Sequence, residues 1–112
     1  MATKQSTVDF IEDQLSALGK IGHRKMFGDY ALYHDGRVVG FVCDDTLFLK
    51  ITPPGKIFAG NHYQEGHPYP GAKPYLQVDG DRLEQRDWLT TLVRITSENL
   101  PKTTSKSKKK MP

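Results

Sequence analysis

The chain has 112 residues, a formal net charge of +3 and a sequence pI of about 9.0, and 37% of its residues are hydrophobic. This length predicts one domain with a modest core. Five of the 16 basic residues, and none of the 13 acidic ones, lie in residues 102–112, so the rest of the chain is slightly acidic. That balance argues against a basic nucleic-acid-binding face on the domain. It predicts a domain at residues 1–101 and a disordered lysine-rich tail at 102–112.

Cysteine content and the first residues indicate the compartment. Cys43 is the only cysteine, so no internal disulfide forms, and we expect a reducing environment. The first ten residues, MATKQSTVDF, lack the apolar segment of a secretory signal, and no apolar run approaches membrane-spanning length. The sequence therefore predicts a cytoplasmic protein without a membrane partner.

The first predicted element is a helix at residues 8–18. Its apolar positions recur every three or four residues and form one face, composed of Val8, Ile11, Leu15 and Leu18. Ser6 or Thr7 is suited to cap its N-terminus, and Gly19 is suited to the left-handed position that ends a helix.

Four strands joined by tight turns are expected next. The strands are predicted at residues 21–26, 30–34, 37–43 and 46–51, with turn signals at Phe27-Gly28-Asp29, Asp35-Gly36 and Asp44-Asp45. Asp-Gly between alternating runs is a strong hairpin signal, because a two-residue turn needs positive φ and Gly adopts it without steric cost.

Two-residue turns determine which side chains share a face of the sheet, because cross-strand partners point to the same side. The predicted core face holds Ala31, Tyr33, Val38, Gly40, Val42, Leu47, Leu49 and Ile51. The opposite face is unusually aromatic for a surface in water. Its candidate interface residues are Tyr30, Leu32, Arg37, Phe41, Phe48 and Lys50, beside His34, Val39 and Thr46. A three-residue loop at Asp44 would invert the last strand and alter this assignment.

The remaining elements complete an α+β pattern. Residues 52–55, read TPPG, end the fourth strand, and residues 56–61 are expected to form a short helix with Ile57 and Phe58 turned inward. A loop at 62–73, a strand at 74–78, a turn at Asp79-Gly80 and a long helix at 85–100 follow. This order predicts a two-layer α+β domain, with an antiparallel sheet of about five strands and the N-terminal and C-terminal helices packed on one face.

One motif set spans the central strands. It consists of residues 25–33, read KMFGDYALY, followed by Asp35-Gly36, Val42, Asp44-Asp45, Leu47 and Leu49-Lys50. It resembles the TfoX/Sxy N-terminal domain family, whose signature is roughly K-x-M-F-G-G-Y-G-L-Y, then D-G, then V-x-D-D-x-L-x-L-K. The likeness continues through Lys73-Pro74-Tyr75 to the last helix, although Asp29 and Ala31 stand where the signature has glycines.

This resemblance implies a small α+β domain, related in shape to secretion-chaperone-like folds, in a family without established enzymatic activity. Full-length members resemble regulators of natural competence that assist transcription at promoters using the cAMP receptor protein, and they carry a second, C-terminal domain. We expect this chain to be a stand-alone version of the N-terminal domain that carries the lysine tail instead.

Other chemical signals in the sequence are weak. Met26-Phe27-Gly28 is interpreted as a tight turn whose two apolar side chains pack in the core, and Asp44-Asp45 as a solvated turn in preference to a cation site. The histidines, which are His23, His34, His62 and His67, lack the spacing of zinc ligands. Cys43 is interpreted as a small buried hydrophobe, because the sequence places no base beside it. We therefore predict no catalytic residue, no cofactor and no metal.

Three hypotheses about function follow. The first is a non-enzymatic regulatory or adaptor domain whose aromatic face contacts a protein, either a transcription factor or a second copy in a homodimer. The second is a nucleic-acid-binding protein in which the aromatic face stacks bases and the tail attracts phosphates without sequence preference. The tail residues concerned are Lys102, Lys106, Lys108, Lys109 and Lys110. The third is a small enzyme or metal protein centred on Cys43 and the loop histidines.

Overall fold

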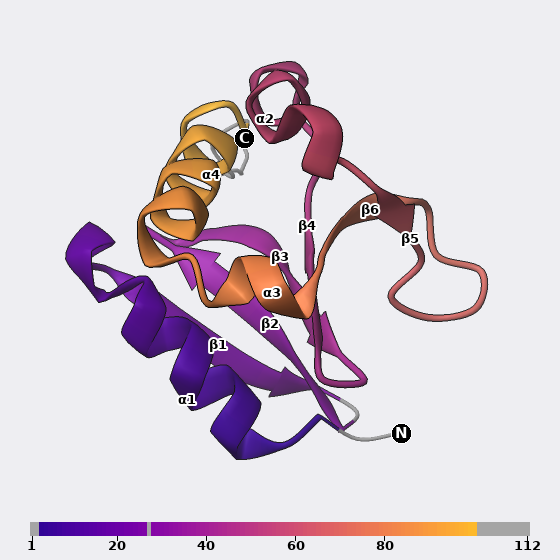
Figure 1. The fold of residues 1–112 in the computed structure, drawn as a ribbon. Helices are drawn as coiled ribbons and strands as arrows, with labels where there is room; N and C mark the ends of the chain where they lie inside the picture. The colour runs from indigo at the N-terminus through magenta and orange to yellow at the C-terminus, as the bar shows by residue number, and fades with distance from the viewer. Residues whose placement is uncertain (1–2, 27, 101–112) are drawn as a thin grey trace, which may run out of the picture.

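The computed structural model describes residues 3–26 and 28–100, and these form one antiparallel sheet with helices packed against it (Figure 1). The strands are β1 (Ile21–Met26), β2 (Asp29–His34), β3 (Arg37–Cys43), β4 (Thr46–Leu49), β5 (Glu65–Gly66) and β6 (Tyr75–Val78). Their spatial order is β1-β2-β3-β4-β6-β5. All the predicted strands form, and the two-residue β5 inside the predicted loop is an addition, so the described sheet has six strands.

The helices give the domain its second layer. They are α1 (Gln5–Gln14), α2 (Pro53–Ala59), α3 (Gly80–Leu83) and α4 (Arg86–Glu98), with 3-10 turns at Ser16–Leu18 and Gly60–His62. Figure 1 shows α1, α3 and α4 on the same side of the sheet, which confirms the predicted two-layer α+β arrangement. Within the described part of the chain, no helix is long and apolar enough to cross a membrane.

One apolar core fills the space between these helices and the sheet. Its fully buried side chains come from α1, the strands and α4, and are Val8, Ile11, Leu15, Leu32, Val39, Val42, Leu47, Leu49, Leu76, Leu89, Leu92 and Val93. Because residues from both ends of the chain share this cluster, α1 and α4 depend on the same central strands for their burial.

The N-terminus of α1 is capped from a distant turn. The predicted caps Ser6 and Thr7 lie inside the helix, whose N-cap is Lys4. The carboxylate of Asp45 accepts hydrogen bonds from the Lys4 backbone N–H and the Thr7 hydroxyl, both at 2.9 Å. These bonds lower the pKa of Asp45, with the Lys4 backbone bond the largest cause. The turn predicted to be merely solvated therefore holds α1 against the β3–β4 hairpin.

Helix α2 begins earlier than predicted. Thr52 precedes it and accepts a hydrogen bond from the Gly55 backbone N–H at 3.1 Å, which caps the helix. The helix therefore starts at residue 53, and its buried positions are Gly55 and Ala59. The predicted inward orientation of Ile57 and Phe58 is wrong, because these side chains are 80% and 36% exposed.

Both predicted hairpin turns have two central residues with positive φ. The values are 52° and 79° at Asp35 and Gly36, and 52° and 58° at Asp44 and Asp45. Positive φ at both positions matches the right-handed twist of the flanking strands. The second turn gives the predicted β3–β4 register, in which Gly40 pairs with Leu49.

A bulge between β2 and β3 changes the register that the first turn predicts. The expected pairing of Ala31 with Gly40 is wrong: Leu32 pairs with Gly40, and Val39 is left as an extra residue. One inserted residue shifts the alternation of side chains between the two faces. The side chains between the bulge and the Asp35-Gly36 turn therefore point to the face opposite the one predicted. The side chains of β2 on the other side of the bulge do so as well.

Because of the bulge, the faces predicted for the side chains of β2 and of the first half of β3 are wrong. Tyr30, Leu32 and Val39, expected on the outer side, belong to the core cluster. Ala31 and Tyr33, expected in the core, point to the other side, as do their partners on β3. The remainder of β3 and β4 follows the prediction, with Val42 and Leu47 in the core.

Candidate binding face of the sheet

The side of the sheet opposite α1 and α4, called the outer face below, carries its own small apolar cluster. Its buried members are Cys43, Phe48 and Tyr75, with Phe41 half-buried against them. The rings of Phe41 and Tyr75 meet edge to face, with centroids 5.5 Å apart. A sheet face with this many aromatic rings, over which none of the described helices lies, has the composition expected of a contact surface.

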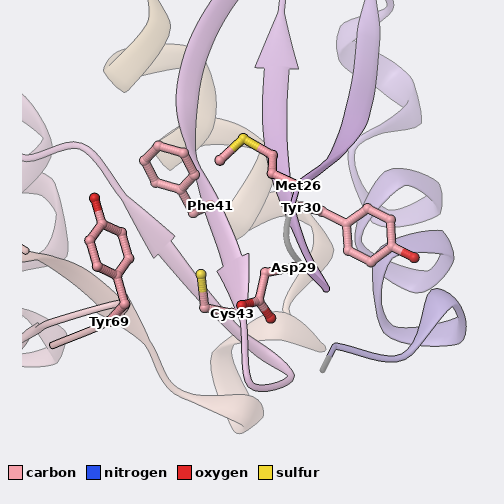
Figure 2. Close-up of a pocket in the computed structure, with 6 residues that line it drawn as sticks. All are labelled: Met26, Asp29, Tyr30, Phe41, Cys43 and Tyr69. Carbon is pink, nitrogen blue, oxygen red and sulfur yellow. The ribbon is translucent and has the colours of Figure 1, made fainter. Parts of the chain in front are cut away.

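The outer face is hollowed at the end where the β1–β2 and β3–β4 turns meet. A cavity of about 460 Å³ lies there, lined by Met26, Asp29, Tyr30, Phe41, Cys43 and Tyr69. Figure 2 shows the Tyr69 ring on the loop side of the cavity, facing Phe41 and Cys43. The Tyr30 ring is turned away from it toward α1, so Tyr30 contributes to the wall without its ring. The volume and the mainly apolar wall suit one inserted side chain or a small ligand.

Asp29 places a carboxylate in the wall of this cavity and also connects neighbouring segments through hydrogen bonds. Its carboxylate accepts hydrogen bonds from the Thr3 hydroxyl at 2.8 Å and from the Asp44 backbone N–H at 3.3 Å. Burial raises the pKa of the Cys43 thiol to about 11, and the Asp29 charge adds to the shift. At neutral pH Cys43 is therefore a protonated thiol, which is a poor nucleophile.

The opposite end of the outer face is cationic. Lys50 and Lys73 line a second hollow of about 350 Å³ together with Ile51, Pro74, Tyr75 and Leu100. The ammonium of Lys73 lies 6.0 Å from the centroid of the Tyr75 ring. Burial lowers the pKa of Lys50, and the charge of Lys73 lowers it further. The outer face therefore has a carboxylate at one end and two ammonium groups at the other.

The six predicted interface residues are divided between the two faces. Phe41, Phe48 and Lys50 lie on the outer face as predicted. Tyr30 and Leu32 do not, because the bulge turns both into the core.

Arg37 is also misplaced by the prediction. It lies on the helix side of the sheet, where its guanidinium donates a hydrogen bond to the Ser97 carbonyl of α4 at 3.0 Å. Its neighbour His34 contacts the Ser97 hydroxyl at 2.7 Å on the same side. The basic and aromatic surface predicted from the sequence is therefore smaller, and its positive charge comes from Lys50 and Lys73.

The residues of the family motif have structural roles at the turns. Gly28 has a φ of 87°, and its carbonyl accepts a hydrogen bond from the Thr3 backbone N–H. Met26 is half-exposed and lines the outer cavity, so its predicted packing in the core is wrong. Phe27 lies outside the described residues. The Asp35-Gly36 turn is exposed, with Asp35 3.5 Å from the ammonium of Lys20.

The metal and histidine sites, for which the sequence carries only weak signals, also lack geometric support among the described residues. Among the described residues, no group of three His, Cys, Asp or Glu side chains is placed to hold a metal ion. His23 pairs with Glu12 on α1, and His67 contacts the Ala72 carbonyl inside its own loop. The tail residues Lys102, Lys106, Lys108, Lys109 and Lys110 lie outside the described residues.

Sequence reasoning missed Asp29, Tyr69, Lys73 and Tyr75 as members of the outer face. Tyr75 was within reach, because alternation along β6 places it on the same side as Gln77, the partner of Phe48. Tyr69 and Lys73 belong to the irregular segment between β5 and β6, where no periodicity indicates a direction. Only the folded loop brings them to the face.

Comparison with known proteins points to one family. The family model of the TfoX N-terminal domain matches residues 13–100. A relative from Spirochaeta aurantia, described as an uncharacterized 12.7 kDa protein in the trpE 5′ region, is 44% identical over 101 residues. Those residues cover 90% of this chain and 86% of the relative. The matched range includes every strand and both hollows of the outer face.

Proposed function

We propose, from the premise that this chain belongs to the TfoX N-terminal domain family, that it is a non-enzymatic regulatory domain in competence-type control of transcription. It would act in the cytoplasm through protein–protein contact on the outer face. Its partner would be a transcription factor, such as the cAMP receptor protein of the same organism, or a second copy of the chain.

The observation that carries this proposal is the apolar cavity between the Phe41 ring and the loop that bears Tyr69. Tyr69 is 55% exposed and Phe41 is half-buried, so both rings are accessible to a partner. Aromatic residues that border a pocket are typical anchors of protein interfaces. The opposite face of the sheet is sealed by α1 and α4, which leaves the outer face as the accessible side.

The chemistry of the cavity favours docking over catalysis. Its thiol, Cys43, has a pKa of about 11, so it is protonated at neutral pH. The carboxylate of Asp29 is engaged by the Thr3 hydroxyl and the Asp44 backbone N–H. Neither group is arranged as an activated nucleophile or as a general base beside one.

Binding to a purified partner tests the proposal. We expect the cAMP receptor protein or a second copy to bind the wild-type chain, as measured by calorimetry or by sedimentation velocity. Tyr69→Glu should weaken that binding about tenfold or more, because it places a charge at the cavity rim. Ile57→Glu is the matched control, since Ile57 is an exposed apolar residue on α2. Unchanged affinity for Tyr69→Glu, or a monomer that binds neither partner, would refute docking on this face.

A second candidate function, binding of nucleic acid without sequence preference, is favoured by the cationic hollow at Lys50 and Lys73. Amide NMR titration with duplex DNA at low and physiological salt separates it from the first. Shifts confined to residues 102–110 that vanish with salt would indicate electrostatic attraction to the tail alone. Shifts at Phe41, Phe48 and Lys50 that persist in salt would make the outer face a nucleic-acid surface.

A further inference from the structure

Two lysines on the outer face share a hollow without an acidic partner. Lys50 is half-buried, Lys73 is exposed in the loop before β6, and Tyr75 lines the same hollow with its ring 6.0 Å from the Lys73 ammonium. None of the ion pairs formed by the described residues includes either lysine. A half-buried ammonium that shares a hollow with a second, exposed ammonium is stabilised by an anion that both can contact.

The described residues that line the hollow do not supply that anion from a side chain. The other lining residues are Ile51, Pro74, Tyr75 and Leu100, none of which is negatively charged at neutral pH. Residues 101–112, which follow Leu100, contain five lysines and no acidic side chain. Both lysines line this one hollow, and the charge of Lys73 adds to the burial that lowers the pKa of Lys50.

We propose that the hollow at Lys50 and Lys73 is a binding site for a phosphomonoester group, held between the two ammonium groups. A terminal phosphate carries a charge of about −1.5 to −2 at neutral pH, which two lysines balance. A carboxylate or a backbone phosphodiester carries one negative charge and would leave one ammonium uncompensated. Lysine binds phosphate as a point charge, so this pair needs no planar geometry of the kind that arginine provides.

Binding of inorganic phosphate to the full-length chain tests this inference. Amide and lysine side-chain NMR at pH 7.5 reports on the hollow separately from the tail. We expect saturable shifts at Ile51, Tyr75 and Lys50, and a loss of affinity of about tenfold or more in both Lys50→Met and Lys73→Met. Lys56→Met is the matched control, because Lys56 also lies over a tyrosine ring, 5.0 Å from the centroid of Tyr63. It should bind phosphate like the wild type.

Dimethyl phosphate is the probe that separates the two sources of phosphate. As a diester with a single charge it should bind at least about tenfold more weakly than inorganic phosphate. Equal affinity for the two would overturn the phosphomonoester assignment and indicate a nucleic-acid backbone. Shifts confined to residues 101–112, or equal affinity in Lys50→Met and the wild type, would show that the tail alone attracts the anion and would refute the site.

Discussion

The two faces of the sheet differ in how they are covered. The helix side is sealed by α1 and α4 and holds the apolar core, with Leu32, Val42 and Leu92 fully buried. The outer side has a smaller aromatic cluster, with Tyr69 of the loop after β5 beside it, and it is hollowed at both ends. The difference shows that one face is sealed in the core, whereas the other leaves apolar and charged groups accessible to solvent.

The largest expected effect on stability comes from a substitution at Gly40, which follows the bulge on β3. A Cβ on Gly40 would lie 2.0 Å from the Phe48 carbonyl oxygen and 2.9 Å from the Leu49 Cα. Because both are backbone atoms, β4 would have to move away from β3. We expect Gly40→Ala to cost about 3 kcal/mol or more, or to prevent folding, as measured by urea denaturation.

Gly22→Ala on β1 provides the control for that experiment. A Cβ on Gly22 meets no atom within 4 Å, and its φ is not in the left-handed region. We expect a change within about 0.5 kcal/mol. If Gly40→Ala were as mild, the close approach of β3 and β4 at Gly40 would not require a residue without a side chain.

The bulge also explains how far the sequence predicts this protein. Turn chemistry and alternation are local, so the strands, both hairpin turns and the two-layer α+β class follow from the sequence. The bulge is a property of how β2 and β3 pair, with Val39 left over between the partners of Leu32 and Tyr33, and local alternation does not reveal such an inserted residue. For that reason the core residues Tyr30 and Leu32 were predicted to lie on the outer face.

The capping of α1 and the walls of the cavity have the same non-local origin. Asp45 bonds Lys4, the N-cap residue of α1 that lies 41 residues earlier in the chain, and no local pattern in the sequence predicts that contact. Tyr69 lines the cavity only because its loop folds over β3. Local signals therefore predicted the sheet, and missed the contacts that build the candidate site.

The next prediction compares the loss of stability when one side chain from each face is truncated. Leu32 is fully buried beneath the helices, so Leu32→Ala should cost about 2–5 kcal/mol, through lost burial and a residual cavity. Phe41 borders an existing cavity on the outer face and is half-buried, so Phe41→Ala should cost less than about 2 kcal/mol. Urea denaturation of the two variants measures the difference. Equal costs would mean that the outer cluster is part of the core.

A smaller effect is expected where a turn holds α1 over the core face. Asp45→Gly removes the carboxylate that bonds the Lys4 N–H and the Thr7 hydroxyl, and should lower the urea midpoint. Asp44→Gly is the matched control. Both positions have positive φ, which Gly adopts readily, so the control should match or exceed the wild-type midpoint. A lower midpoint for the control alone would contradict the capping role of Asp45.

The lowered pKa of Asp45 adds a test of pH dependence. A carboxyl whose pKa is lower in the folded state stabilises that state above the unfolded value, which is about 3.9 for Asp. The contribution is lost as the pH falls through the folded pKa. The difference in midpoint between the wild type and Asp45→Gly should therefore be full at pH 6 and shrink below about pH 4. A difference that grew on acidification would have the wrong sign.

The last prediction concerns the reactivity of Cys43, which reports how well the outer face is covered. Cys43 is 5% exposed with a pKa of about 11, so its alkylation by iodoacetamide at pH 7.5 should be slow and should rise with pH beyond 9. Ile57→Cys in a Cys43→Ser background supplies an exposed reference thiol, which we expect to react at least about tenfold faster. A rate for Cys43 that equals the reference and levels off near pH 9 would mean that the loop bearing Tyr69 opens readily. The outer face would then be an open surface, in contrast to the helix side, which α1 and α4 cover.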